Sequence, residues 1–359
     1  MQAPKKSGKA RLTRYANWII LLFIAFLCAT CKQALPPEEG RKHLRAFDNE
    51  VIQLAGRIGK TEAFRALIKL SEIPELPIPF MNEKYVYGYD FNANKGLYHL
   101  NAKTGTIERQ AESNRVELIY PFDSKRDSLA NFTLIDYGET QTALQMIFPQ
   151  KLEAKITAGE KTLFTAHLSA SYEHDLPAKM DVELLFANFK FKLLLNTTFY
   201  PSYAKLNIAF ELEENGEKKL STSLSSNVTT VDNTLYYNDI NIALTAFPIR
   251  LMYQSDQDFL NTKTINFIET YNNHTQIDIS SPNGNQIGQV FLAQIMGRDR
   301  INPMIHYPDG SVENLEDMLF ILQKLLNMKM FILDGLAQAP LQNRISETRP
   351  PLMAFGIVE

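Results

Sequence analysis

Hydrophobic positions follow two different periods along the chain, and the change between them separates a helical start from a strand-rich middle. Near the N-terminus, apolar residues recur every three or four positions, which is the spacing of one helix face. They are Leu44, Phe47, Val51, Leu54 and Ile58, followed by Phe64, Leu67, Ile68 and Leu70. This pattern predicts two helices within residues 43–72. The second, over residues 61–71, should end before Pro74, Pro77 and Pro79, because proline cannot continue a helix.

From Tyr85 onward, apolar residues alternate with other residues, a pattern typical of strands that bury one face. The alternating runs include residues 85–91, 164–172, 180–186, 189–195 and 206–212. Several runs approach ten residues, well beyond the usual five or six, and long antiparallel strands twist. We therefore expect a mainly β (α+β) fold: one large curved antiparallel sheet, or an open half-barrel, with helices from both ends of the chain packed on it.

Glycines mark the expected turns between these strands, because each follows residues that favour a turn and can adopt a positive φ. The turns are Asn94-Lys95-Gly96, Lys103-Thr104-Gly105, Asn215-Gly216, Asn283-Gly284 and Asp309-Gly310.

One of these hairpins can be assigned a register from the sequence. A two-residue loop at Asn215-Gly216 would place Phe210 opposite Ser221, whereas a three-residue loop that includes Glu214 places Phe210 opposite Leu220. Directly opposed residues share a face of the sheet, and a slip by one residue inverts every side chain. The apolar pairing therefore predicts the three-residue loop.

A helical period returns near the end of the chain and predicts a helix over residues 312–334. Ser311 is suited to be its N-cap, acidic residues fill the first turns, and Gly335 is suited to end it. Its apolar stripe consists of Leu315, Met318, Leu319, Leu322, Leu325 and Leu326. We expect this stripe to pack against the sheet, with residues 336–359 forming a C-terminal tail.

The first 31 residues have the layout of an export signal. A basic start contains Lys5, Lys6, Lys9, Arg11 and Arg14 without an acidic residue, and the apolar run 18–27 and Cys28-Ala29-Thr30-Cys31 follow it. The apolar run is shorter than the about 20 residues that span a bilayer comfortably. This order of basic, apolar and small residues is that of a secretory signal peptide.

A cysteine directly after small residues resembles the lipobox of bacterial lipoproteins. The resemblance implies that residues 1–30 are removed and that the thiol of Cys31 is acylated. Cys28 fits less well because its neighbours are bulky. The alternatives are an uncleaved membrane anchor and an ordinary signal peptide cut near Ala34.

Charge and cysteine content narrow the function of the remaining chain. Without residues 1–30 it has 32 Lys and Arg against 40 Asp and Glu, a net charge of −8. This balance argues against a nucleic-acid partner, which needs a concentrated basic surface. With Cys28 removed and Cys31 acylated, the body has no thiol for a disulfide, a nucleophile or a zinc site. We expect a tether over residues 31–42 and a single β-rich domain over residues 43–335.

The motifs that carry catalytic chemistry are missing or incomplete. Gly59-Lys60-Thr61 lacks the first glycine of a phosphate-binding loop, since Leu54 is at that position. The six histidines do not form a helical metal-binding pair, and no serine lies in a Gly-x-Ser-x-Gly turn. We therefore assign no catalytic residue, metal ligand or cofactor, although a pair of carboxylates brought together by the fold stays open.

Residues 98–106, Tyr-His-Leu-Asn-Ala-Lys-Thr-Gly-Thr, resemble a strand–turn signature of outer-membrane lipoproteins of Bacteroidota. The order of lipobox, helices, long β-meander and Asp-Gly turn resembles them too. These families have no assigned activity, so no catalytic residue carries over. At the level of the fold, helices beside a curved sheet are similar to periplasmic carriers of lipids and lipoproteins.

The resemblance implies a lipid-anchored protein of the outer membrane, on either its periplasmic or its surface side. Our leading hypothesis is a non-enzymatic lipoprotein whose concave sheet binds an apolar or amphipathic ligand or a partner protein. The alternatives are a glycan-active hydrolase that uses paired carboxylates and a structural envelope protein that contacts its neighbours through strand edges.

Overall fold

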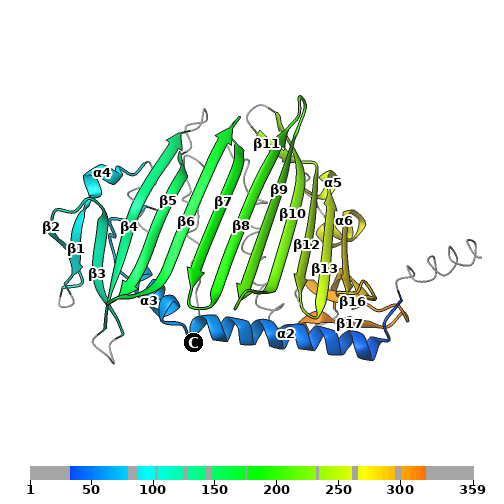
Figure 1. The fold of residues 1–359 in the computed structure, drawn as a ribbon. Helices are drawn as coiled ribbons and strands as arrows, with labels where there is room; N and C mark the ends of the chain where they lie inside the picture. The colour runs from blue at the N-terminus through cyan, green and yellow to red at the C-terminus, as the bar shows by residue number, and fades with distance from the viewer. Residues whose placement is uncertain are drawn as a thin grey trace, which may run out of the picture.

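The computed structural model describes residues 33–320, except for residues 80–87, 102–103, 124–127, 142–146, 175, 232–233, 261–265 and 296–300. One 17-stranded sheet dominates this part of the chain, and a few helices accompany it (Figure 1). This arrangement confirms the predicted mainly β fold with a large, open antiparallel sheet.

In chain order, the first nine strands are β1 (Gly96–Leu100), β2 (Ile107–Ala111), β3 (Val116–Asp123), β4 (Ser128–Gln141), β5 (Ile147–Ala158), β6 (Lys161–Glu173), β7 (Leu176–Phe186), β8 (Phe189–Phe199) and β9 (Ala204–Glu214). The remaining strands are β10 (Glu217–Val231), β11 (Thr234–Tyr237), β12 (Asp239–Ala246), β13 (Ile249–Asp256), β14 (Thr275–Ser280), β15 (Gln286–Gln294), β16 (Ile301–His306) and β17 (Val312–Asn314).

The ladders connect these strands almost in chain order. The order in space is β2–β1–β3, then β4 to β10 in sequence, and then β12 to β17. Strand β11 pairs with β10 beside β12. All ladders are antiparallel apart from the β1–β3 pair. Adjacent strands of a sheet are twisted relative to one another, and the twist accumulates across many strands. Figure 1 shows β16 and β17 running across the direction of the central strands.

The two faces of the sheet have different chemistry. Successive residues of a strand point to opposite faces, and in β8 one face carries Phe191 and Leu193 while the other carries Lys192 and Leu194. We call the first the apolar face and the second the polar face. Each ladder continues the division, since Leu193 pairs with Phe210 in β9 and Lys192 pairs with Glu211.

The helices are α2 (Pro37–Gly59), α3 (Glu62–Ser71), α4 (Phe91–Asn94), α5 (Gln257–Leu260) and α6 (Phe267–His274), and η2 (Leu315–Asp317) is a single 3₁₀ turn. Helix α2 lies along one end of the strands and reaches across much of the sheet (Figure 1). The two helices predicted within residues 43–72 are confirmed. Helix α2 begins six residues earlier than expected, at Pro37, where proline suits the first helical position.

Residues 33–35, which the sequence analysis placed in a tether, are joined to the sheet. Leu35 N donates to Gln286 O at 2.9 Å, and Gln286 N donates to Gln33 O at 3.0 Å. The chain is therefore fixed to β15 directly before α2 begins.

Two clusters of buried apolar residues lie on the apolar face. One joins α3 and the proline-rich segment to β3–β6 and reaches Phe189 and Leu212. The other joins the first half of α2 to strands β12–β16 and to η2, and it includes Leu44, Phe47 and Tyr307. Helix α2 contributes to both clusters, because Leu54 belongs to the first.

The predicted register of the Asn215-Gly216 hairpin is wrong. Glu214 pairs with Glu217, so the loop has two residues, and Leu212 rather than Phe210 is opposite Leu220. The extra residue that the prediction placed in the loop is instead in a β-bulge between Lys218 and Leu220. This bulge returns the apolar residues to the apolar face.

The predicted start of the C-terminal helix is also wrong. The Asp309-Gly310 turn, with Gly310 at φ +90°, folds residues 312–314 back as β17. Asn314 then accepts a hydrogen bond from Glu316 N and begins the 3₁₀ turn η2. The hairpin with β16 satisfies backbone groups that a helix start would leave unpaired. The remainder of the predicted helix, residues 321–334, lies outside the described residues, as does the C-terminal tail.

The alternating run 85–91 does not continue as a strand to its end. Residues 85–87 lie outside the described residues, and Phe91 begins the short helix α4. Asp90 causes this change, because its side chain accepts a hydrogen bond from Ala93 N and caps the helical turn. Of the five predicted turn glycines, Gly96 does not have a positive φ; it begins β1.

Candidate functional site

The apolar face continues between the two buried clusters as a field of half-buried side chains. Seven neighbouring strands contribute to it: β6, β7, β8, β9, β10, β12 and β13. The members are Leu168, Val182, Leu184, Phe191, Leu193, Ile208, Phe210, Leu224, Ile242, Leu244, Leu251 and Tyr253. We call this set the central apolar field. Its side chains are large and free of charge, so it is suited to contact with apolar surface.

The opposite, polar face forms a pocket of about 830 Å³ over β12–β17. The side chains that line it are mainly amides and imidazoles, and they include Asn241, Gln254, Gln276, Gln289, Phe291 and His306. The volume is in the range of small-molecule sites, but the lining is more polar than is usual for them. Amides donate and accept hydrogen bonds without charge, so the pocket suits a neutral polar ligand.

Asp278 orients two of these amides. Gln276 Nε2 donates to Asp278 Oδ2 at 2.6 Å, and Gln289 Nε2 donates to Asp278 Oδ1 at 2.9 Å. Because each nitrogen is held by the carboxylate, the position of each amide group is set before a ligand arrives.

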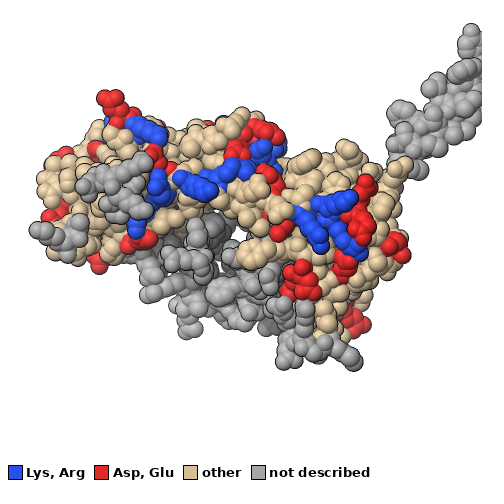
Figure 2. All heavy atoms as spheres, turned by 90° about the horizontal axis from the view of Figure 1, so that it is seen from below, with Lys and Arg blue, Asp and Glu red and all other residues tan. Residues whose placement is uncertain are grey.

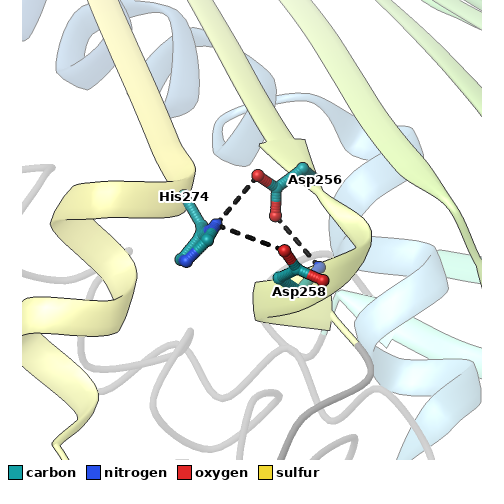
Figure 3. A group of neighbouring side chains, drawn as sticks. All are labelled: Asp256, Asp258 and His274. Atoms are coloured by element: carbon teal, nitrogen blue, oxygen red, sulfur yellow. Dashed lines mark hydrogen bonds and ion pairs between the residues drawn. The ribbon is translucent and has the colours of Figure 1, made fainter.

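Asp256 and His274 line the pocket, and Asp258 lies next to them (Figure 3). Asp256 is the last residue of β13, Asp258 lies in α5, and His274 is the last residue of α6. One donor atom from each lies within 4.8 Å of the other two. In the described part of the chain, this is the group of His, Cys, Asp and Glu side chains close enough to hold a metal ion.

Two contacts hold the short helices that carry these residues. The Tyr271 ring of α6 meets the Phe259 ring of α5 edge-on, with centroids 5.3 Å apart, and Tyr271 is buried. The Asn272 side chain donates to Leu292 O and accepts from Leu292 N, each at 2.8 Å, which ties α6 to β15. The positions of Asp258 and His274 thus follow from packing rather than from the local sequence.

The two oxygens of Asp256 have different partners. Oδ1 accepts hydrogen bonds from the backbone N–H groups of Asp258, at 3.0 Å, and Phe259, at 3.4 Å. Oδ2 lies 2.9 Å from His274 Nδ1. Partial burial raises the pKa of Asp256, but the hydrogen bonds from His274 and the two amides outweigh it, so that this pKa lies below its usual value.

Helix α2 presents charge of both signs at the end of the sheet. Arg57 makes two hydrogen bonds to Glu214 at 2.9 and 3.0 Å, and Arg41 bonds to Glu313 at 2.8 Å. Figure 2, which views the molecule from below, shows the Lys and Arg side chains of the described residues interspersed with Asp and Glu side chains. This view therefore shows no extended surface of a single sign over the described residues.

The predicted lipidation site, Cys31, lies outside the described residues. The sequence analysis assigned no metal ligand and found no metal-binding pair among the histidines, and it did not associate His274 with Asp256 and Asp258. His274 follows Asp258 by sixteen residues, so no local motif connects them. The one available signal was the Asp-x-Asp pair at a strand end, which is too common to be specific.

Among the helices of the described residues, none is long and apolar enough to cross a membrane. No protein-family model matches the chain, and neither a curated protein nor a solved structure is detectably similar to it.

Proposed function

We propose that this protein is an exported lipoprotein, anchored to the outer membrane through Cys31, that binds an apolar or amphipathic ligand on its apolar face. The central apolar field carries the proposal. It joins seven strands in one continuous surface whose side chains are half-buried, whereas the clusters on either side of it are buried.

Contact with this field would be energetically favourable for an acyl chain. Complete burial of one leucine-sized side chain contributes about 1.5–3 kcal/mol. Each half-buried member of the field therefore has part of this free energy left to gain. Because the members are spread along the sheet, an extended ligand would collect small contributions from many strands.

The alternative of a glycan-active hydrolase is less well supported. Such enzymes need two carboxyl groups at a defined separation and a general acid whose pKa is raised. Asp256 lines the pocket and lies close to Asp258, but the pKa of Asp256 is lowered, and His274 contacts its carboxylate. Asp256 therefore lacks the proton that a general acid must supply at neutral pH.

Adjacent leucines of β8 provide a matched test of ligand binding. Leu193 belongs to the central apolar field, and Leu194 points to the polar face with 40% of its surface exposed. We expect Leu193→Asn to weaken binding of a fluorescent fatty acid about 10-fold, since it replaces leucine-sized contact by an amide. Leu194→Asn should leave the affinity unchanged. Equal effects of the two substitutions, or no binding by the wild type, would overturn the ligand proposal.

A separate experiment tests the membrane anchor. Intact-mass analysis of the native protein should find that residues 1–30 have been removed and that Cys31 carries acyl chains. Cys31→Ser should release the protein from the membrane fraction while the purified body still binds the fatty acid. An unmodified thiol at Cys31 would refute the anchor and leave the binding result to stand separately.

A further inference from the structure

The polar face carries a second candidate site, which the ligand proposal does not use. We propose that Asp256, Asp258 and His274 form a binding site for a divalent transition-metal ion of the zinc type, at the end of the amide-lined pocket (Figure 3).

The spacing of the donor atoms fits a small ion. His274 Nδ1 lies 2.9 Å from Asp256 Oδ2 and 4.0 Å from Asp258 Oδ2. Ligands arranged tetrahedrally at zinc–ligand distances of about 2.0–2.1 Å lie about 3.3 Å from one another. The two separations lie on either side of this value, so movements of less than an ångström would bring the donors to it.

The kind of donor indicates the class of metal. An imidazole nitrogen suits zinc, copper, iron and nickel, whereas calcium and magnesium prefer sites made of oxygen alone. Two carboxylates and a neutral imidazole also balance the charge of a divalent ion. Both arguments favour a transition metal over calcium or magnesium.

The surroundings of Asp256 favour metal binding by a single oxygen. Two backbone N–H groups hold Oδ1, which leaves Oδ2 directed toward His274. Ligands of metal ions are commonly oriented in this way by a second set of hydrogen bonds. Asp258 is 67% exposed and His274 is 32% exposed, so that an ion can reach both from solvent.

The site is open toward the pocket, whereas a structural zinc site is closed by four protein ligands. Three protein ligands leave at least one coordination position for water or a ligand atom, as in catalytic zinc sites. Asp256 and His274 line the pocket of about 830 Å³, so an ion held by them and by the neighbouring Asp258 is next to a space that holds more than a water molecule. The amides of Gln254, Gln276 and Gln289 lie in the same pocket.

Titration calorimetry of the full-length protein with zinc chloride tests the proposal. We expect one zinc ion per chain, and we expect His274→Ala, Asp258→Asn and Asp256→Asn each to weaken binding at least about 10-fold. Asp256→Asn retains an oxygen that can accept the backbone hydrogen bonds of α5, so it removes the charge without removing the cap. Circular dichroism would verify that each variant is folded.

The matched controls are His167→Ala and Asp181→Asn, which change exposed residues on the polar face of β6 and β7. Both should bind zinc with wild-type affinity. The absorption of bound cobalt(II) in the visible range supplies an independent reading, because it should change when His274 is replaced. If zinc does not bind, or if the His274 and Asp258 variants bind it as the wild type does, the proposed site is wrong.

Discussion

Gly216 and Gly56 show how backbone conformation decides what a glycine contributes. Gly216 has φ +78° in the two-residue turn between β9 and β10, whereas Gly56 lies within α2. A Cβ atom at either position would meet no neighbour within 4 Å. The two sites therefore differ in backbone conformation and not in the space around them.

We expect opposite effects from the same substitution at these sites. Gly216→Ala should lower the free energy of unfolding by about 1 kcal/mol, since an L-residue is strained at positive φ. Gly56→Ala should raise it by about 0.5 kcal/mol, because alanine favours the helix. Urea denaturation of both variants measures the difference, and a stabilising Gly216→Ala would refute the turn geometry.

At the scale of secondary-structure elements, α2 is joined to β17 by an ion pair between residues far apart in the chain. Arg41 Nε donates to Glu313 Oε1 at 2.8 Å, and Tyr307 OH donates to Glu313 Oε2 at 3.2 Å. The hydrogen bond from Arg41 is the main reason that the pKa of Glu313 lies below its usual value.

This lowered pKa predicts the pH dependence of the contact. The ionised carboxylate of Glu313 stabilises the fold above the pKa of the unfolded chain, about 4.3, and the contribution is lost as the pH falls through the lower pKa of the folded state. Glu313→Gln should reduce the free energy of unfolding by about 1 kcal/mol at pH 7. Its difference from the wild type should shrink below a pH of about 4.

Glu217→Gln is the control, because Glu217 forms an ion pair with Lys219 while its side chain is 75% exposed. Exposed pairs contribute little, so this variant should match the wild type at every pH. A constant difference between Glu313→Gln and the wild type down to pH 2 would contradict the assignment.

At the scale of the whole molecule, the open sheet has two buried clusters, and α2 belongs to both of them. Leu44 is fully buried in the cluster over β12–β16, and Leu54 lies in the cluster over β3–β6. Leu220 of β10 is packed against both. The arrangement indicates that the two ends of the sheet depend on each other through one helix and one central strand.

Leu44→Ala should therefore weaken both ends. Loss of a fully buried leucine costs about 2–5 kcal/mol, and we expect faster hydrogen exchange in β3–β6 as well as in β12–β17. Ile52→Ala, at a 40% exposed position of the same helix, should change neither region. Faster exchange confined to β12–β17 would show that the clusters unfold separately.

Much of this fold could be predicted because its pattern is local. Alternation over seven to nine residues identified β6–β9, and the three-to-four spacing identified α2 and α3, since side-chain direction follows directly from backbone period. The same rule divided the residues of each strand into two sets, although it could not say which distant strand would extend each set.

Some errors arose where two local arrangements satisfy the same pattern. The apolar residues of β10 face the apolar side whether the extra residue is in the loop or in a bulge, and the chain uses a bulge between Lys218 and Leu220. The residues after Ser311 have suitable signals for a helix start, but pairing with β16 makes them a strand.

By itself, the sequence determined the strand-rich middle, the helical N-terminal region and the chemistry of each face, because these depend on residues a few positions apart. The tertiary structure alone decided the register of the hairpin, the division of the core into two clusters and the meeting of Asp256 with His274. These features depend on which segments pack together, as the contact between α5 and α6 does, and no spacing in the chain encodes that contact.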